Sequence, residues 1–110
     1  MLAPVYITIN NVPQPYIAGS GNGIVTVNGV AASRHIFLFD ANSMELLRRT
    51  ASLSNGHYIF NGLDTTKQYV VMARDYNREY EPAVFDYVTP ATDLTIAQQQ
   101  ELWQSWQTSP

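Results

Sequence analysis

The 110-residue sequence has no cysteine and few charged residues. Without cysteine the chain forms no disulfide, no thiolate metal site and no cysteine nucleophile. Charged residues make up 14% of the chain, against roughly 25% in a typical soluble domain. Hydrophobic residues nevertheless reach 45%, so the composition is not that of a disordered chain. A single folded domain is expected from this length.

Basic charge is also scarce, with six Lys and Arg residues against nine Asp and Glu and a net charge of −3. Nucleic-acid binding needs clustered Lys and Arg, and no cluster occurs, so no nucleic-acid partner is expected. No apolar run approaches the roughly 18 residues of a membrane span, so no membrane partner is expected. Residues 1–5 lack the basic start and apolar stretch of a secretory signal, and none is expected.

Composition divides the chain into three zones. Residues 1–22 contain Pro4, Pro13 and Pro15 and an alternating stretch at 5–9, which predicts an edge strand followed by an extended arm. Residues 23–90 predict strands near 24–27, 34–40, 45–52, 57–60, 68–74 and 83–88, with Asn-Gly turns at 28–29, 55–56 and 61–62. Residues 91–110 predict a short helix over 95–107 with a capping box from Thr95 to Gln98. This pattern is typical of an all-β sandwich of about seven strands.

Two predicted strands, at 36–39 and 69–73, are apolar on both faces. A half-buried strand should instead alternate apolar and polar residues. If Ile36, Leu38 and Val71 point into the core, the outward set is Phe37, Phe39, Ile59, Val70 and Met72. Either the N-terminal strand or the C-terminal helix folds back over this outer face, or the face contacts another chain. The candidate interface residues are Val5, Tyr6, Ile7, Phe37, Phe39, Leu102, Trp103 and Trp106. Leu102, Trp103 and Trp106 share one helix face, and the tryptophans would anchor a neighbouring subunit.

A second candidate surface is aromatic. Tyr76, Tyr80 and Tyr87 could form a platform for a sugar or a protein partner, and ordinary packing at a sheet end is the alternative. Residues 75–81 carry oxygens at alternate positions as in a calcium loop, but Tyr80 stands where such a loop needs glycine. A solvated acidic loop is therefore expected there, and no metal.

Catalytic patterns are weak throughout. His35 and His57 have no second ligand at metal spacing, and no G-x-S-x-G elbow or phosphate loop occurs. Ser33, Ser52 and Ser54 are expected in turns and at strand edges. No catalytic residue, metal or cofactor is expected, and an enzyme is the least favoured reading.

A family pattern runs through residues 23–90. It consists of Gly29-Val30, Ile36-x-Leu38, the run Ser54-Asn55-Gly56-His57-Tyr58-Ile59-Phe60, Gly62-Leu63 and Tyr69-x-Val71. This pattern resembles the carboxypeptidase regulatory-like, or transthyretin-like, β-sandwich. The resemblance implies an Ig-like or transthyretin-like sandwich, with an extended N-terminal arm and a C-terminal helix added to it.

A second resemblance is to small virion proteins of tailed bacteriophages. It is carried by Val27-Asn28-Gly29-Val30, Ala32, Arg34, Leu38-Phe39-Asp40, Tyr69-Val70-Val71, Tyr80, Asp86 and Val88-Thr89-Pro90. It implies a non-enzymatic structural protein of the tail, neck or capsid surface, assembled in the host cytoplasm as part of a symmetric or homo-oligomeric assembly with other virion proteins. The alternative function is a carbohydrate- or cell-surface-binding module. Related adhesin repeats form Lys–Asn cross-links, but the single lysine, Lys67, is misplaced for one.

Overall fold

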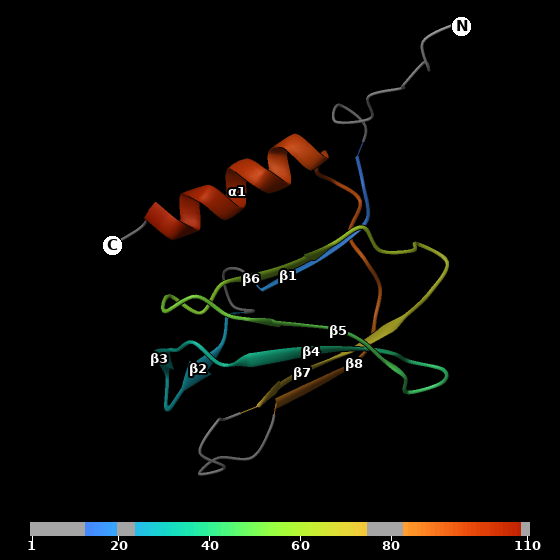
Figure 1. Ribbon diagram of the computed structural model, residues 1–110, viewed down its shortest axis with the longest axis horizontal. Helices are drawn as coiled ribbons and strands as arrows, with labels where there is room; N and C mark the ends of the chain where they lie inside the picture. The colour runs from blue at the N-terminus through green and yellow to red at the C-terminus, as the bar shows by residue number, and fades with distance from the viewer. Residues whose placement is uncertain (1–12, 20–23, 75–82, 109–110) are drawn as a thin grey trace, which may run out of the picture.

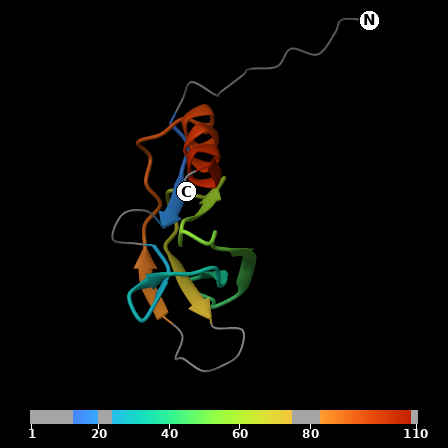
Figure 2. The same cartoon turned by 90° about the vertical axis from the view of Figure 1, so that its left-hand side faces the viewer.

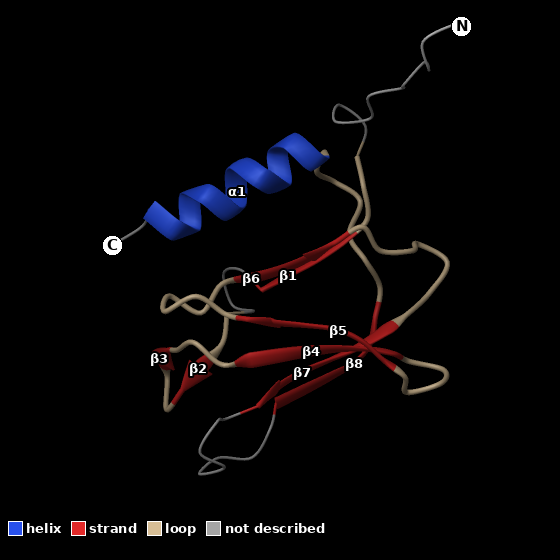
Figure 3. Cartoon of the chain, viewed as in Figure 1, coloured by secondary structure: helices blue, strands red, loops and turns tan. Residues whose placement is uncertain are grey.

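The computed structural model describes residues 13–19, 24–74 and 83–108, which form eight strands and one helix (Figures 1 and 3). The strands are β1 (Tyr16–Gly19), β2 (Thr26–Val27), β3 (Val30–Ala31), β4 (His35–Asp40), β5 (Leu46–Ala51), β6 (Tyr58–Asn61), β7 (Tyr69–Arg74) and β8 (Ala83–Val88). The helix is α1 (Ile96–Thr108). The expectation of a mostly β fold with a short C-terminal helix is confirmed.

Three antiparallel sheets account for all described strands. Their orders are β5-β4-β7-β8, β1-β6 and β2-β3. Helix α1 lies beyond the β1-β6 sheet, so that sheet is sandwiched between the helix and the four-stranded sheet (Figures 1 and 2). The helix therefore does not cover the outer face of the four-stranded sheet, where covering by a terminal segment was one expectation.

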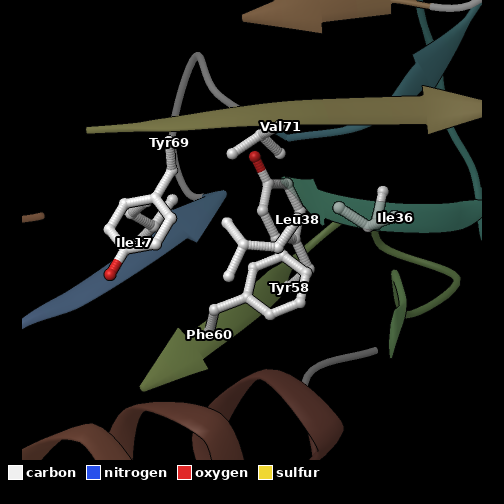
Figure 4. Close-up of a cluster of buried hydrophobic side chains, with 7 residues drawn as sticks. All are labelled: Ile17, Ile36, Leu38, Tyr58, Phe60, Tyr69 and Val71. Atoms are coloured by element: carbon white, nitrogen blue, oxygen red, sulfur yellow. The ribbon is translucent and has the colours of Figure 1, made fainter. Parts of the chain in front are cut away.

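The core lies between the β1-β6 sheet and the four-stranded sheet (Figure 4). Its buried members come from β1, β4, β6 and β7 and are Ile17, Ile36, Leu38, Tyr58, Phe60, Tyr69 and Val71. Ile36 and Leu38 have no exposed surface at all, because β4 is a central strand with neighbours on both sides. The inward set supposed for Ile36, Leu38 and Val71 is thus the one that the core contains.

The turns between strands occur at the three Asn-Gly pairs that the sequence predicts. Asn28 and Gly29 both have positive φ, 53° and 79°, as a two-residue hairpin between β2 and β3 requires. Gly56 and Gly62 also have positive φ, at the other two predicted Asn-Gly turns. A Cβ on Gly56 would additionally lie 2.6 Å from the Val25 carbonyl oxygen, so a side chain there is doubly unfavourable.

Strand β1 departs from the expectation of an extended arm over residues 1–22. Tyr16 pairs with Asn61 and Gly19 with Tyr58, and Tyr16 and Ile17 are buried. This pairing depends on a partner that is distant in the sequence, which local propensity does not reveal.

Candidate interaction surfaces

The first candidate surface is helix α1, whose start forms the predicted capping box. The Thr95 Oγ1 accepts from the Gln98 backbone N–H at 3.1 Å, and the Gln98 Oε1 accepts from the Thr95 N–H at 2.9 Å. These reciprocal bonds satisfy two donors that a helix start would otherwise leave free. The predicted helix boundary near residue 95 is thereby confirmed.

Trp106 holds the other end of the helix against its own chain. Its ring stacks on His57 with centroids 4.6 Å apart and an interplanar angle of 24°, and only 7% of the residue is exposed. The Asn55 side-chain amide donates to the Trp106 carbonyl oxygen at 2.7 Å. Trp106 was expected to anchor a neighbouring subunit, and its burial here leaves it unavailable for that role. Leu102 and Trp103, expected beside it at an interface, are half-buried.

Gln99 makes a structural contact that the sequence does not predict. It is 2% exposed, and its Nε2 donates to the Gln14 and Leu94 carbonyl oxygens at 3.0 and 3.2 Å. Gln99 lies three residues before Leu102 and seven before Trp106, so it belongs to the same helix face. That spacing was the available signal, and it was overlooked because glutamine is seldom fully buried.

The outer face of the four-stranded sheet is the second candidate surface. Phe37 and Phe39 are half-buried there, with ring centroids 6.5 Å apart. Val70 was expected to point outward as well, and it lies on this face but is only 4% exposed. It lies opposite Phe39 in the register, on a central strand with neighbours on both sides, which leaves a small side chain little contact with water.

Strand β8 is the most exposed apolar element among the described residues. Val84, Phe85 and Tyr87 are 54%, 57% and 64% exposed. The register between β7 and β8 shifts between Tyr69 and Val71, and Tyr87 at this bulge has a φ of 54°. Val84 and Phe85 were not predicted as surface contacts, although residues 83–88 lack clear alternation just as residues 36–39 do.

An apolar cavity of about 310 Å³ opens beside β8. Its floor comes from β4, β7 and β8, and residues 24–28 and Tyr58 close the other side. Ile36, Val71, Ala73 and Phe85 supply apolar walls, and Arg34 and Arg74 also line it. Phe85 thus belongs both to the exposed edge and to the cavity, so the two features form one continuous surface.

Two acidic side chains, Asp40 and Asp64, stabilise turns. Backbone N–H groups of Asn42 and Ser43 donate to Asp40 and lower its pKa, and Lys67 lies 3.8 Å from the same carboxylate. The Thr66 hydroxyl and backbone N–H similarly lower the pKa of Asp64. Both carboxylates are held ionised, and each closes a loop between strands.

The serine and histidine candidates also have structural partners. The buried Ser52 hydroxyl donates to the Ala32 carbonyl oxygen and accepts from the Arg34 N–H, both at 2.8 Å. The His57 ring stacks on Trp106. Within residues 13–19, 24–74 and 83–108, no group of three His, Cys, Asp or Glu side chains could hold a metal ion.

Several predicted residues lie outside the described part of the chain. These are Val5, Tyr6 and Ile7 of the candidate interface and Tyr76 and Tyr80 of the aromatic platform, together with the loop considered for calcium. Tyr87 alone of the platform is described, so the platform stays a prediction. In the described part of the chain, no helix is both long and apolar enough to cross a membrane.

Comparison with known proteins adds no relative. No family model matches the chain, and neither the curated proteins nor the solved structures contain a significant match.

Proposed function

We propose that this chain is a non-enzymatic structural protein of a tailed-bacteriophage virion, in the tail, the neck or the capsid decoration. In this proposal it is a small rigid body that docks on neighbouring subunits. The observation that carries the docking role is the exposed apolar edge of β8, where Val84, Phe85 and Tyr87 are each more than half exposed. Exposed apolar side chains that gather in one place usually mark a contact surface. The virion assignment itself rests on the sequence resemblance.

The rigid body in this proposal is an Ig-like or transthyretin-like β-sandwich. The support is that buried side chains of the β1-β6 sheet and the four-stranded sheet meet in one core. In such a sandwich the two inner faces interdigitate, while the outer faces and the sheet edges remain free for partners. The proposed docking therefore uses an edge and leaves the core unchanged.

The terminal segments have different roles in this proposal. Helix α1 is held to its own chain by Trp106 and Gln99, so it stabilises the body instead of reaching a neighbour. Residues 5–9, with their alternating apolar pattern, remain as the segment for contact with another subunit. This assignment keeps Val5, Tyr6 and Ile7 in the proposed interface and removes Trp106 from it.

The location is tested by isolating phage particles from the strain that encodes the chain and quantifying their proteins by mass spectrometry. We expect the chain in the particle fraction at a fixed ratio to the other structural proteins. Recovery only from the particle-free lysate would overturn the virion assignment.

The docking role is tested separately on the purified chain. Size-exclusion chromatography with light scattering should give a mass that rises with concentration toward a defined oligomer. A chain that stays monomeric at every concentration, both alone and mixed with dissociated particle proteins, contradicts the docking role.

A further inference from the structure

We infer that residues 5–9 of one copy of this chain add as an extra strand to the β8 edge of a second copy, above the apolar cavity beside Phe85. This inference rests on the proposed docking function and names its partner and its contact site. Three independent observations support it: the open edge, the cavity and the pattern of the segment that would fill it.

The β8 edge is open to a further strand. Strand β8 ends the order β5-β4-β7-β8, so it has a described neighbour on one side only. A strand at the end of a sheet presents unpaired N–H and C=O groups that can pair with another chain. Ala83–Val88 contains no lysine, arginine or proline, and its single charged residue, Asp86, lies at the end of the stretch before the bulge. Pairing is expected over residues 83–86, before the bulge at Tyr87.

The opposite edge of the same sheet is protected. Strand β5 carries Arg48 and Arg49 in its middle. The Arg48 guanidinium lies 5.7 Å from the centre of the Phe60 ring and donates to the Asn61 carbonyl oxygen. A strand arriving at β5 would have to pair beside these cations, which makes β8 the favoured edge.

The cavity gives the added strand an apolar surface to cover. It holds about 310 Å³ and is lined by Val25, Ile36, Val71 and Phe85 among others. An apolar opening of this size remains in water unless a ligand or a segment covers it, and covering it gains hydrophobic free energy. Phe85 would then lie beside side chains of the incoming strand, on the same face of the extended sheet.

The alternating side chains of residues 5–9 suit both faces of the sheet at the β8 edge. In an extended strand Val5, Ile7 and Ile9 point to one side, and Tyr6 and Thr8 to the other. Three aliphatic side chains could therefore face Phe85 and the cavity, while Tyr6 and Thr8 lie beside Val84. The segment is uncharged, so it brings no charge to the apolar opening.

The position of Pro13 favours a second copy as the acceptor. Pro13 bridges to Thr95 at the start of α1, and β1 and β6 separate this place from the four-stranded sheet (Figures 1 and 2). Pro13, the first described residue, thus lies on the helix side of the molecule, whereas β8 lies in the sheet farthest from the helix. Donation to another copy repeats head to tail, which builds a ring or a filament.

The absence of cysteine allows a direct test by cross-linking. Thr8→Cys in a tagged chain and Val84→Cys in an untagged chain place thiols on the same side of the proposed pair. Arg49→Cys is the matched control, because Arg49, Phe37, Met72 and Val84 form one row across the sheet. Under mild oxidation of mixed chains we expect a singly tagged covalent dimer with Val84→Cys, and little with Arg49→Cys. If the incoming strand is shifted by two residues, Tyr6→Cys takes the place of Thr8→Cys opposite Val84→Cys.

The possible results separate the two proposals. Equal cross-linking at both edges, or none at either edge in a chain that still oligomerises, overturns the inference and leaves the docking function standing. In the Thr8→Cys/Val84→Cys double variant, a disulfide within a monomer would show that the strand returns to its own β8, which also overturns it. A folded chain that does not associate at all contradicts the docking function itself.

A second measurement does not depend on disulfide geometry. Ile7→Asp and Phe85→Asp should each weaken self-association roughly tenfold or more, because each places a charge in the desolvated contact. Arg49→Asp should leave it nearly unchanged. Circular dichroism and the unfolding midpoint establish that each variant is folded, and unchanged association in folded Ile7→Asp and Phe85→Asp contradicts the inference.

Discussion

Helix α1 and strand β8 are both peripheral and both carry large apolar side chains, yet the fold treats them in opposite ways. In α1, Trp106 is 7% exposed and Gln99 is 2% exposed, because both contact other parts of the same chain. In β8, Val84 and Phe85 are more than half exposed. An apolar stripe in a sequence therefore shows that a surface needs covering, but not whether the same chain provides the cover.

The difference follows from the partners each element meets. The helix has a hydrogen-bonded start at Thr95, a buried amide at Gln99 and an aromatic stack at Trp106. Among the described strands, β8 is paired with β7 alone. Substitutions in α1 should thus reduce the stability of the single chain, whereas substitutions in β8 should act on its association.

The largest expected effect is that of Trp106→Ala. Removing a buried tryptophan costs about 3–5 kcal/mol of unfolding free energy, because a cavity replaces its contacts. Urea unfolding followed by far-ultraviolet circular dichroism measures the loss. Trp103→Ala is the matched control and should cost clearly less, since Trp103 is half-buried. Equal losses in the two variants would mean that the His57 stack does not hold the helix.

Alkaline pH tests the connection between β1 and the segment before α1. Burial, with the hydrogen bond that Tyr16 donates to Asp93, raises the pKa of Tyr16 to about 12. An unfolded tyrosine loses its proton near pH 10, so the folded state holds this proton more tightly. The stability it contributes is complete below pH 10 and is lost as the pH rises toward 12.

The measurement is the thermal unfolding midpoint between pH 9 and pH 12, the range around these pKa values. Tyr16→Phe should reduce the alkaline fall in the midpoint without abolishing it, because burial also raises the pKa of Tyr58. Tyr87→Phe, on the exposed β8 edge, should leave the fall as it is. An identical fall in the Tyr16→Phe variant would contradict the role of the Asp93 contact.

A smaller effect is expected from Thr95→Ala at the start of the helix. Loss of a capping side chain costs roughly 1 kcal/mol, because a backbone N–H loses its acceptor. Chemical unfolding detects this change, with the exposed Thr92→Ala as the comparison. A cost no larger than that of Thr92→Ala would show that the capping box contributes little to stability.

The smallest effect on the single chain is expected from Phe85→Ser. A substitution at an exposed position changes stability by about 0.5 kcal/mol or less, and Phe85 is 57% exposed. Unfolding at a concentration where the chain is monomeric provides the measurement. A loss comparable to that of Trp106→Ala would mean that Phe85 belongs to the core and not to a contact surface.

Local signals account for the elements that the sequence predicted well. The Asn-Gly turns, the strands around them and the capping box each depend on residues within a few positions of one another. The inward positions that the sequence analysis supposed for Ile36 and Leu38 are also buried. Each of these features depends on neighbouring residues, so the local sequence is enough to predict it.

The errors concern contacts between distant segments. Strand β1 pairs with β6, about forty positions away in the sequence. Val70 is buried by its place in the middle of a sheet, and Trp106 by His57. The open β8 edge was likewise not predicted, because the sequence of a single strand does not determine its position in the sheet.

By itself, the sequence determined where the backbone turns, which stretches extend and where the helix begins, since these depend on φ preferences and short-range hydrogen bonds. Only the tertiary structure decided which apolar side chains are covered within the chain, because burial depends on which elements become neighbours. That is why Trp106 belongs to the stable body, whereas Phe85 is left at an open edge beside a cavity.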